Sequence, residues 1–275
     1  MAIKSDGTTL YLTRDIAAAI DRQREYSPSQ SLYVVCATQS FHFEQLFAIL
    51  AKMGFSWVQN LKHIKYGTVN GMSTRNGTVV FLEDILDEAY KTMHDVMKSN
   101  PKRYSEIEDP EAVANALAIS AIVVQDFSAK KIKDYEFSMS RMTSFEGDTG
   151  PFLQYTHVRL CSIARKATPD TMAISPDSNL IRSELGENGL VLQVAKKLAL
   201  FPLIVTDSCQ NHEPNTLVTY LMSLSHSLSS LLEQLPVLQA PTPEAASARL
   251  AFFSAARQVL ANGIILLGLP LLKHM

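Results

Sequence analysis

The spacing of apolar residues changes near residue 90, and this change limits the folds open to the chain. Before it, Ser31–Ala37 (SLYVVCA) is a compact run rich in β-branched residues, as buried strands are. A second predicted strand is Leu61–Gly67. Helical patterns at Asp15–Arg24 and His42–Met53 precede and separate these strands. The order predicts a βαβ-like segment, in which ligands bind at the carboxyl ends of the strands.

Beyond residue 90 the spacing is helical throughout. Predicted helices cover Pro110–Gln125 and residues 152–166, and a third follows Thr242-Pro243-Glu244, where a capping side chain precedes proline. We therefore predict an α/β, partial Rossmann-like segment over residues 1–90, followed by an all-α domain over residues 91–275.

Three further predictions concern the helical part. Phe81, Ile85, Met93 and Met97 lie close to one stripe of a helix that begins after Val79. The segment Ala167–Asn188, rich in Pro, Ser, Asp and Asn, is typical of a long surface connection. The apolar tail GIILLGLPLLKHM, interrupted by glycine and proline, is expected to be a buried end.

Composition narrows the classes of protein. The 275 residues are 47% hydrophobic and 19% charged, enough for a buried core. A net charge of −2 does not indicate a strongly basic nucleic-acid binder, although a local basic patch is compatible with it. Three widely spaced cysteines predict no zinc site and a reducing compartment. Without a signal peptide or an apolar run of roughly 18 residues, we expect a cytoplasmic protein that does not engage a membrane.

Two side chains near the start of the chain suggest a cation site. Tyr11 and Asp15 lie where an extended segment joins a helix, and the two carboxylate oxygens of Asp15 suit a guanidinium. An Asp at a helix start is more often a cap, and spacing alone favours that alternative.

Two further groups follow the predicted strands. Gln39 and His42 come at or just after the end of the first strand. The stretch Gly71–Thr78 (GMSTRNGT) offers two hydroxyls and a guanidinium, from Ser73, Thr74 and Arg75, which could grip a polyphosphate. Each group also has a plain structural interpretation, as a helix start or as a polar loop.

The order of five segments resembles the arginyl-tRNA synthetases over almost the whole chain, from Ile3 to Met275. The segments are SDGTTLYLTRD, a strand followed by Gln39, GMSTRNGTVVF, FEGDTGPFLQYTHVR and ARLAFFSAARQVLANGIILLGL. GMSTR looks like the second signature loop of class I synthetases. FEGDTGPFLQY and AARQVLANG resemble the helical anticodon-binding domain of that family, so the resemblance implies an anticodon-binding-like all-α domain.

The resemblance also implies roles for the candidate residues. Tyr11 and Asp15 would hold the arginine guanidinium, Gln39 would border the arginine and adenosine pocket, and His42 would lie near the nucleotide. The loop that closes over ATP and the tRNA end would be formed by Met72, Ser73, Thr74 and Arg75. Tyr155 and Arg159 match positions that face the anticodon loop. ATP enters as a substrate, and neither a cofactor nor a metal is implied.

The sequence departs from that family in two respects. It begins where the second half of the family's catalytic domain begins, and none of its seven histidines forms the His-x-Gly-His signature of the first half. We therefore expect that full ligation needs a partner that supplies the missing half. Leu232 and Pro236 stand where the fungal or animal-like branch has an aromatic pair, whose stacking holds RNA bases at about 1–3 kcal/mol each. Phe152 replaces a frequent tyrosine, and Asn76 replaces a common lysine.

Three functions remain open from the sequence. The first is an arginyl-tRNA synthetase-like protein that engages arginine or arginyl-tRNA. The second is a transferase that uses arginyl-tRNA to form an arginine-containing cyclodipeptide. The third is a non-catalytic RNA-binding or synthetase-associated protein. A sheet of two or three strands also has an exposed edge, which we expect the chain's own helices, a protein partner or a second copy to cover.

Overall fold

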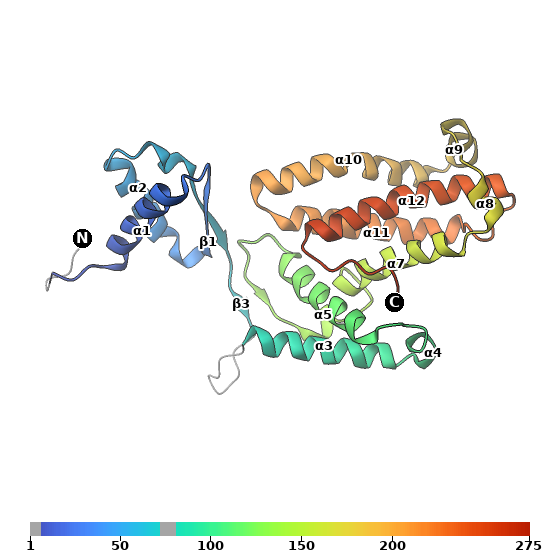
Figure 1. The fold of residues 1–275 in the computed structure, drawn as a ribbon, viewed down its shortest axis with the longest axis horizontal. Helices are drawn as coiled ribbons and strands as arrows, with labels where there is room; N and C mark the ends of the chain where they lie inside the picture. The colour runs from blue at the N-terminus through green and yellow to red at the C-terminus, as the bar shows by residue number, and fades with distance from the viewer. Residues whose placement is uncertain (1–6, 72–80) are drawn as a thin grey trace. The chain divides into compact units, whose positions relative to one another are not determined.

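The computed structural model describes residues 7–71 and 81–275 (Figure 1). The chain divides into two compact units. The first comprises Met1–Asn70 and Lys131–Glu136, and the second comprises Gly71–Lys130 and Phe137–Met275. The predicted boundary at residue 90 lies within α3 (Leu82–Lys98), a continuous helix of the second unit.

The first unit has helices on a parallel strand pair. Its elements are α1 (Tyr11–Tyr26), β1 (Ser31–Cys36), the 3₁₀ turn η1 (Ala37–Gln39), α2 (Ser40–Lys52), η2 (Ser56–Asn60), β2 (Leu61–Tyr66), β3 (Val69–Asn70) and β4 (Tyr135–Glu136). Both longer strands and both helices confirm the predicted βαβ order. β1 pairs with β2 in parallel, with Ser31 opposite Leu61, and β3 pairs with β4.

Side-chain alternation along β1 assigns its two faces. Tyr33 and Val35 pack with the buried residues of α1 and α2, among them Phe43. Leu32 and Val34 point to the other face and are 45% and 65% exposed. Among the described strands β1 pairs with β2 alone, so no described strand lies along its second edge. Cover for this edge stays a prediction.

The second unit is built almost entirely from helices. In chain order these are α3, α4 (Pro101–Tyr104), α5 (Pro110–Phe127), α6 (Met139–Met142), α7 (Gly150–Lys166), α8 (Pro169–Ala173), α9 (Ser178–Leu185), α10 (Gly189–Asn211), α11 (Pro214–Gln234) and α12 (Pro243–Leu266). The predicted start signals act as expected. The hydroxyls of Thr149 and Thr242 accept backbone hydrogen bonds, at 3.2 Å each, from Phe152 and Ala245.

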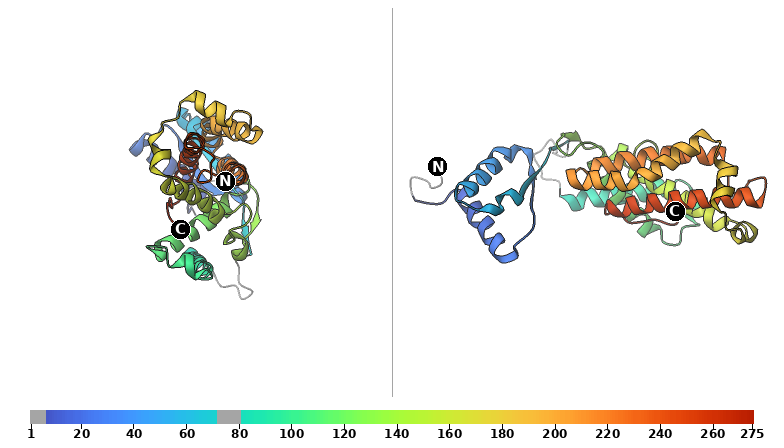
Figure 2. Two further views of the ribbon diagram at one scale, coloured as in Figure 1. Left: turned by 90° about the vertical axis from the view of Figure 1, so that its right-hand side faces the viewer. Right: turned by 90° about the horizontal axis from the view of Figure 1, so that it is seen from above.

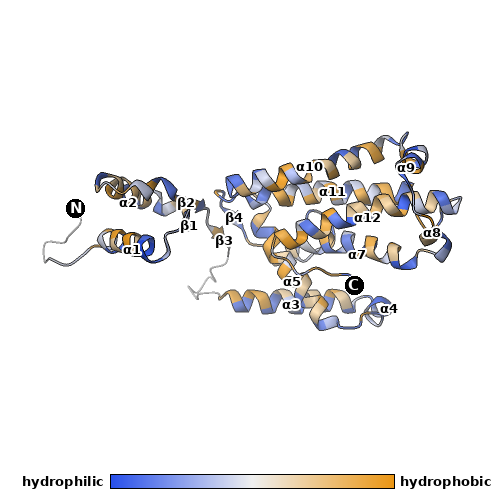
Figure 3. Cartoon of the chain, turned by 45° about the horizontal axis from the view of Figure 1, so that its top comes forward, coloured by the Kyte–Doolittle hydropathy of each residue, from blue (hydrophilic) through white to orange (hydrophobic). Residues whose placement is uncertain are grey.

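Long helices enclose the main core of this unit. α10, α11 and α12 lie side by side in Figure 1 and in the right-hand view of Figure 2. Leu221, Leu224 and Leu228 of α11 are fully buried, as are Leu260 and Ile264 of α12. Figure 3 shows that the apolar colouring is extensive on α5, which has nine buried residues and packs against α3 and α7.

The carboxyl-terminal tail returns to α7. Leu267 and Leu269 are buried, while Ile265 and Leu266 are exposed, so the predicted buried end is buried only in part. The carboxamide of Gln154 on α7 holds the tail. Its Nε2 donates to the carbonyl of Pro270 at 2.6 Å, and its Oε1 accepts from the backbone N–H of Leu272 at 3.3 Å.

Two local predictions were wrong. Residues 167–188 contain α8 and α9 rather than one long connection. Thr168 and Asp177 accept backbone hydrogen bonds as N-caps there, and residue types typical of loops also start helices. Phe81 is 66% exposed as the N-cap residue of α3, so it does not extend the buried stripe of Ile85, Met93 and Met97.

We expected no apolar segment long enough to cross a membrane, and one helix departs from that expectation. α10 is long and apolar enough to cross a membrane by length and composition, and 11% of its most apolar window is buried. The same test is passed by helices of soluble proteins, so it is weak evidence. Here α10 packs on α11 through polar contacts. Tyr220 donates to the carbonyl of Lys197 at 2.9 Å, and the Lys197 ammonium donates to the hydroxyl of Ser223 at 2.7 Å.

We expect His157 to make stability depend on pH. Burial lowers the pKa of this α7 imidazole, because the cation loses its hydration, and the positive charges of Arg257 and Lys273 act in the same direction. Between the lowered pKa of the folded state and the ordinary value, the unfolded chain therefore binds a proton at His157 that the folded chain does not bind. Stability should therefore be complete above about pH 6.5 and fall below it, by at most about 1.4 kcal/mol per pH unit.

Urea unfolding at pH 7.5 and 5.5 measures this effect. The wild type should lose more unfolding free energy than His157→Gln over this interval. Equal losses in the two proteins would show that His157 does not contribute.

Candidate functional site

A hydrogen-bonded histidine–carboxylate pair joins the two helices of the first unit at the predicted cation site. Nε2 of His42, in the first turn of α2, lies 2.7 Å from Oδ2 of Asp15 on α1. Asp15 is the fifth residue of α1, whose N-cap is Leu10, so its interpretation as a helix cap is wrong. Its side chain is 48% exposed and that of His42 is 26% exposed. In the described part of the chain no partner is found for Oδ1 of Asp15, which leaves an acceptor open to solvent.

Tyr11 and Gln39 lie in the elements that carry this pair. Tyr11 is the first residue of α1, one turn before Asp15, so both side chains share a helix face. It is 80% exposed. Gln39 ends η1, between β1 and α2, and its exposed side chain does not cap α2. The elements around the end of β1 thus carry all four predicted residues, although the one contact found among these four is that between Asp15 and His42.

Cys36 ends β1 next to this group. Hydrogen bonds from the Thr38 side chain and backbone lower the pKa of its thiol, and the Thr68 hydroxyl contributes in the same sense. The sequence alone did not single out this thiol. The remaining predicted residues, Met72, Ser73, Thr74 and Arg75, lie outside the described residues.

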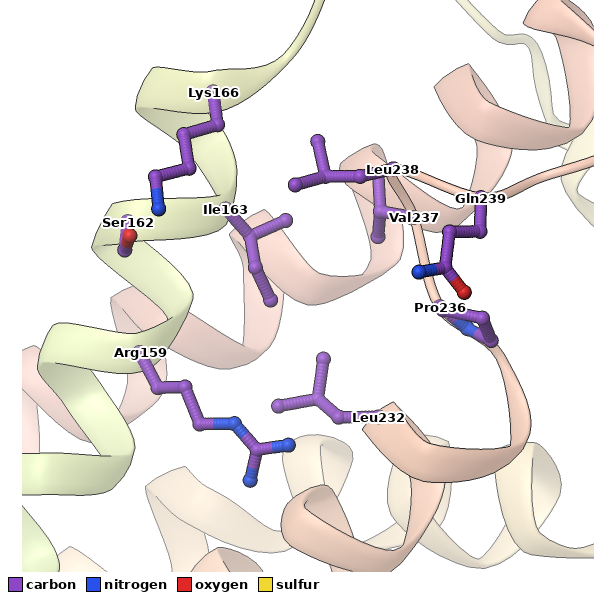
Figure 4. Close-up of a pocket in the computed structure, with 9 residues that line it drawn as sticks. All are labelled: Arg159, Ser162, Ile163, Lys166, Leu232, Pro236, Val237, Leu238 and Gln239. Carbon is purple, nitrogen blue, oxygen red and sulfur yellow. The ribbon is translucent and has the colours of Figure 1, made fainter.

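A half-open pocket of about 270 Å³ lies in the helical unit (Figure 4). Arg159, Ile163 and Lys166 reach it from α7, and Leu232, Pro236 and Leu238 line the opposite side. Its described lining holds two cationic side chains and no carboxylate. Such a pocket suits an anionic ligand with an apolar or aromatic body, because the cations attract phosphate and the aliphatic side chains exclude water.

The pocket joins two observations from the sequence that had seemed separate. Arg159 was expected to bind tRNA, and Leu232 and Pro236 were noted as departures from an aromatic pair; all three line it. Lys166 was missed. The sequence could have indicated it, because residues 159, 163 and 166 are spaced at i, i+4 and i+7 and so lie on one face of a helix.

Tyr155 does not line that pocket, although it lies one turn before Arg159 on α7. Near the start of the same helix, Phe152 stacks on His226 of α11, with ring centroids 4.8 Å apart. Nε2 of His226 in turn lies 2.7 Å from Oδ1 of Asp148. The α7 start therefore carries an exposed cluster of aromatic and charged groups.

Family models match most of the chain. A model described as "tRNA synthetases class I (R), catalytic domain" matches residues 1–139, and one described as "DALR anticodon binding domain" matches residues 153–275. The first covers half of the chain and contains the Asp15–His42 pair. The second contains the Arg159 pocket.

Named relatives agree with these models. The chain is 47% identical over 274 residues to the cytoplasmic arginine–tRNA ligase of Saccharomyces cerevisiae, covering 99% of this chain and 44% of that protein. It is 44% identical to the mitochondrial arginine–tRNA ligase of the same yeast, covering 97% of this chain and 41% of the relative. The chain thus spans about half the length of the curated relatives it matches.

Solved structures show the same fold. Arginyl-tRNA synthetase from Thermus thermophilus superposes with a TM-score of 0.85 at 25% identity, covering 100% of this chain and 50% of that one. The enzyme from Plasmodium falciparum has a TM-score of 0.82 at 24% identity. Residues 1–139 are therefore a fragment of a class I catalytic domain, which includes the first unit and the start of the second, and residues 153–275 are an all-helical anticodon-binding domain. The chain belongs to the arginyl-tRNA synthetase family of class I aminoacyl-tRNA synthetases.

Proposed function

We propose that this protein binds arginine at the Asp15–His42 pair and binds arginine tRNA through its helical unit. The observation that carries the proposal is the 2.7 Å contact between Asp15 and His42. His42 occupies one carboxylate oxygen and orients the group, so the other oxygen remains available to a guanidinium. Tyr11 and Gln39 would border the bound arginine.

ATP is the second proposed substrate. His42 stands at the amino-terminal turn of α2, where backbone N–H groups favour anions. Met72, Ser73, Thr74 and Arg75 would close over the phosphates. The reaction class named by the relatives is the ligation of arginine to tRNA. Arginine-dependent pyrophosphate exchange by the purified chain tests whether it activates arginine without the partner that its sequence leads us to expect.

The proposal also includes a cellular location and a partner for the first unit. We place the protein in the cytoplasm, as is the relative with 47% identity, and fractionation with a tagged chain tests this. We also propose that a partner protein or a second copy covers the second edge of β1 and the sheet face next to it, where Leu32 and Val34 are exposed. Light scattering of the purified chain distinguishes a self-associating protein from one that needs another partner.

Asp15→Asn should weaken arginine binding by about tenfold to a hundredfold. The change removes the negative charge and keeps the shape, and a hydrogen bond to a charged group contributes about 1.5–3 kcal/mol. Titration calorimetry with L-arginine measures the effect. Asp21→Asn, a change of the same type at an exposed position on α1, should leave the affinity within about twofold. Unchanged binding in Asp15→Asn would remove the basis for the arginine site.

Arg159→Gln and Lys166→Gln should each weaken the binding of an arginine tRNA transcript by about fivefold to tenfold at 0.1 M salt. Each loses one phosphate-directed cation, so the slope of log affinity against log salt should fall by about one. Lys102→Gln removes an exposed cation of α4 and should change neither quantity. A full salt slope in both pocket variants would place the tRNA elsewhere on the protein.

A further inference from the structure

A second cavity of the helical unit has no role in the proposed function. It has a volume of about 380 Å³ and lies between the end of α5, α6 and the turn that precedes α7. The residues that matter for its chemistry are Gln125, Arg141, Glu146, Asp148 and Thr149. It shares no lining residue with the Arg159 pocket, so the two can be tested separately.

Gln125 is the unusual residue of this cavity. The residue is 8% exposed, and neither Oε1 nor Nε2 of its carboxamide has a hydrogen-bond partner in the described part of the chain. Its backbone carbonyl, in contrast, accepts from the hydroxyl of Ser128 at 2.8 Å. Buried amides almost always have partners, so in this cavity-lining residue the donor and the acceptor are both available to a ligand.

The walls of the cavity are held in place without a ligand. Oγ1 of Thr149 donates to the carbonyl of Ser144 at 2.6 Å and also caps α7. Gly150 follows, and a Cβ there would lie 2.1 Å from the carbonyl oxygen of Ser120, so α7 starts in direct contact with α5. The backbone around the cavity is therefore fixed before binding, and the rearrangement that a ligand needs is confined to the Gln125 side chain.

Side chains of both charge signs line the cavity. Arg141 and Glu146 are exposed lining residues, and no ion pair of either is found among the residues that the structure describes. Asp148 is already paired with His226. A free guanidinium and a free carboxylate at one cavity match a zwitterion, and the two carboxylates disfavour a phosphodiester.

The Gln125 carboxamide limits which type of side chain such a zwitterion can have. A carboxylate would accept from Nε2 of Gln125 and leave Oε1 unsatisfied, and a guanidinium would do the reverse. Another carboxamide satisfies both atoms. Because the two atoms are buried beneath the surface, Gln125 must turn its carboxamide into the cavity to make these bonds.

We propose that this cavity binds a free α-amino acid with a carboxamide side chain. Arg141 pairs with its carboxylate, Glu146 pairs with its ammonium group, and the two carboxamides exchange hydrogen bonds. The site is a second small-molecule site, remote in sequence from Asp15, and it does not depend on arginine binding.

Titration calorimetry of the full chain with L-glutamine tests the proposal. We expect saturable binding that weakens at least tenfold in Gln125→Met and in Arg141→Gln. Arg103→Gln, a matched change on α4, should bind as the wild type does. L-Glutamate, which has the same length but only acceptors on its side chain, should bind at least tenfold more weakly.

Several outcomes would overturn the proposal. They are the absence of saturable L-glutamine binding, equal binding by Gln125→Met, or a preference for adenosine that Gln125→Met abolishes. Gln125→Met removes an unsatisfied polar group and keeps a similar volume, so its thermal unfolding should confirm that it folds. Since arginine is not a probe here, failure of this site and failure of the Asp15 site give separate results.

Discussion

Gln154→Leu is expected to lower the free energy of unfolding by about 3–4 kcal/mol. The carboxamide is fully buried and makes three hydrogen bonds: to the hydroxyl of Ser120 at 3.0 Å, to the carbonyl of Pro270 and to the N–H of Leu272. Leucine has a similar size but leaves the backbone groups of Pro270 and Leu272 without these partners. Each such loss costs about 1–3 kcal/mol. Chemical denaturation measures the change.

The same variant should release the tail. Amide hydrogen exchange of residues 267–275 should accelerate more than that of α11, because Gln154 ties the tail to α7. Gln258→Leu serves as the control, since Gln258 is exposed and bonds only to Asn262, one turn away, at 2.8 Å. If both variants lose the same small amount of stability, the carboxamide does not anchor the tail.

Gly150→Ala is expected to destabilise the helical unit by about 3 kcal/mol. A Cβ at this position would lie 2.1 Å from the carbonyl oxygen and 2.2 Å from the carbonyl carbon of Ser120. Both are backbone atoms of α5, so no side-chain rotation relieves the overlap. The two helices must move apart, which disturbs the packing between α5 and α7. Thermal or chemical unfolding measures the loss.

Gly189→Ala is the matched control. Gly189 is the first residue of α10, and nothing lies within 4 Å of a Cβ built there. Alanine has the higher helix propensity, so this variant should be as stable as the wild type or more stable by a few tenths of a kcal/mol. A Gly150→Ala protein as stable as Gly189→Ala would contradict the close approach of α7 to α5.

Local signals in the chain were sufficient for most of the fold. The strand predicted at 31–37 follows from a compact β-branched run, which has few alternatives, and the strand predicted at 61–67 is also present. Thr149 and Thr242 mark helix starts through a bond to a residue three positions away. The same short-range signals failed in residues 167–188. The residue types that cap helices also form loops, and α8 and α9, with 5 and 8 residues, are too short to show a helical spacing of apolar residues.

The sequence named the residues of the candidate site, whose roles stay predictions, but it did not indicate their contacts. Asp15 had two interpretations from sequence; the position of Leu10 at the start of α1 excludes the helix cap, and the guanidinium site stays a prediction. The partner of Asp15 lies 27 residues away, at a separation where no local rule operates.

Only tertiary packing shows which polar side chains meet. Gln154 and Gln125 are both buried glutamines in the same helical unit, and neither had a distinguishing pattern in the sequence. Gln154 donates a hydrogen bond to the tail, 116 residues away in sequence. Gln125 lines a cavity, and its carboxamide has no partner among the described residues. Helix and strand propensities arise from bonds within a few residues, whereas hydrogen bonds between distant side chains exist only once the core has brought their elements together.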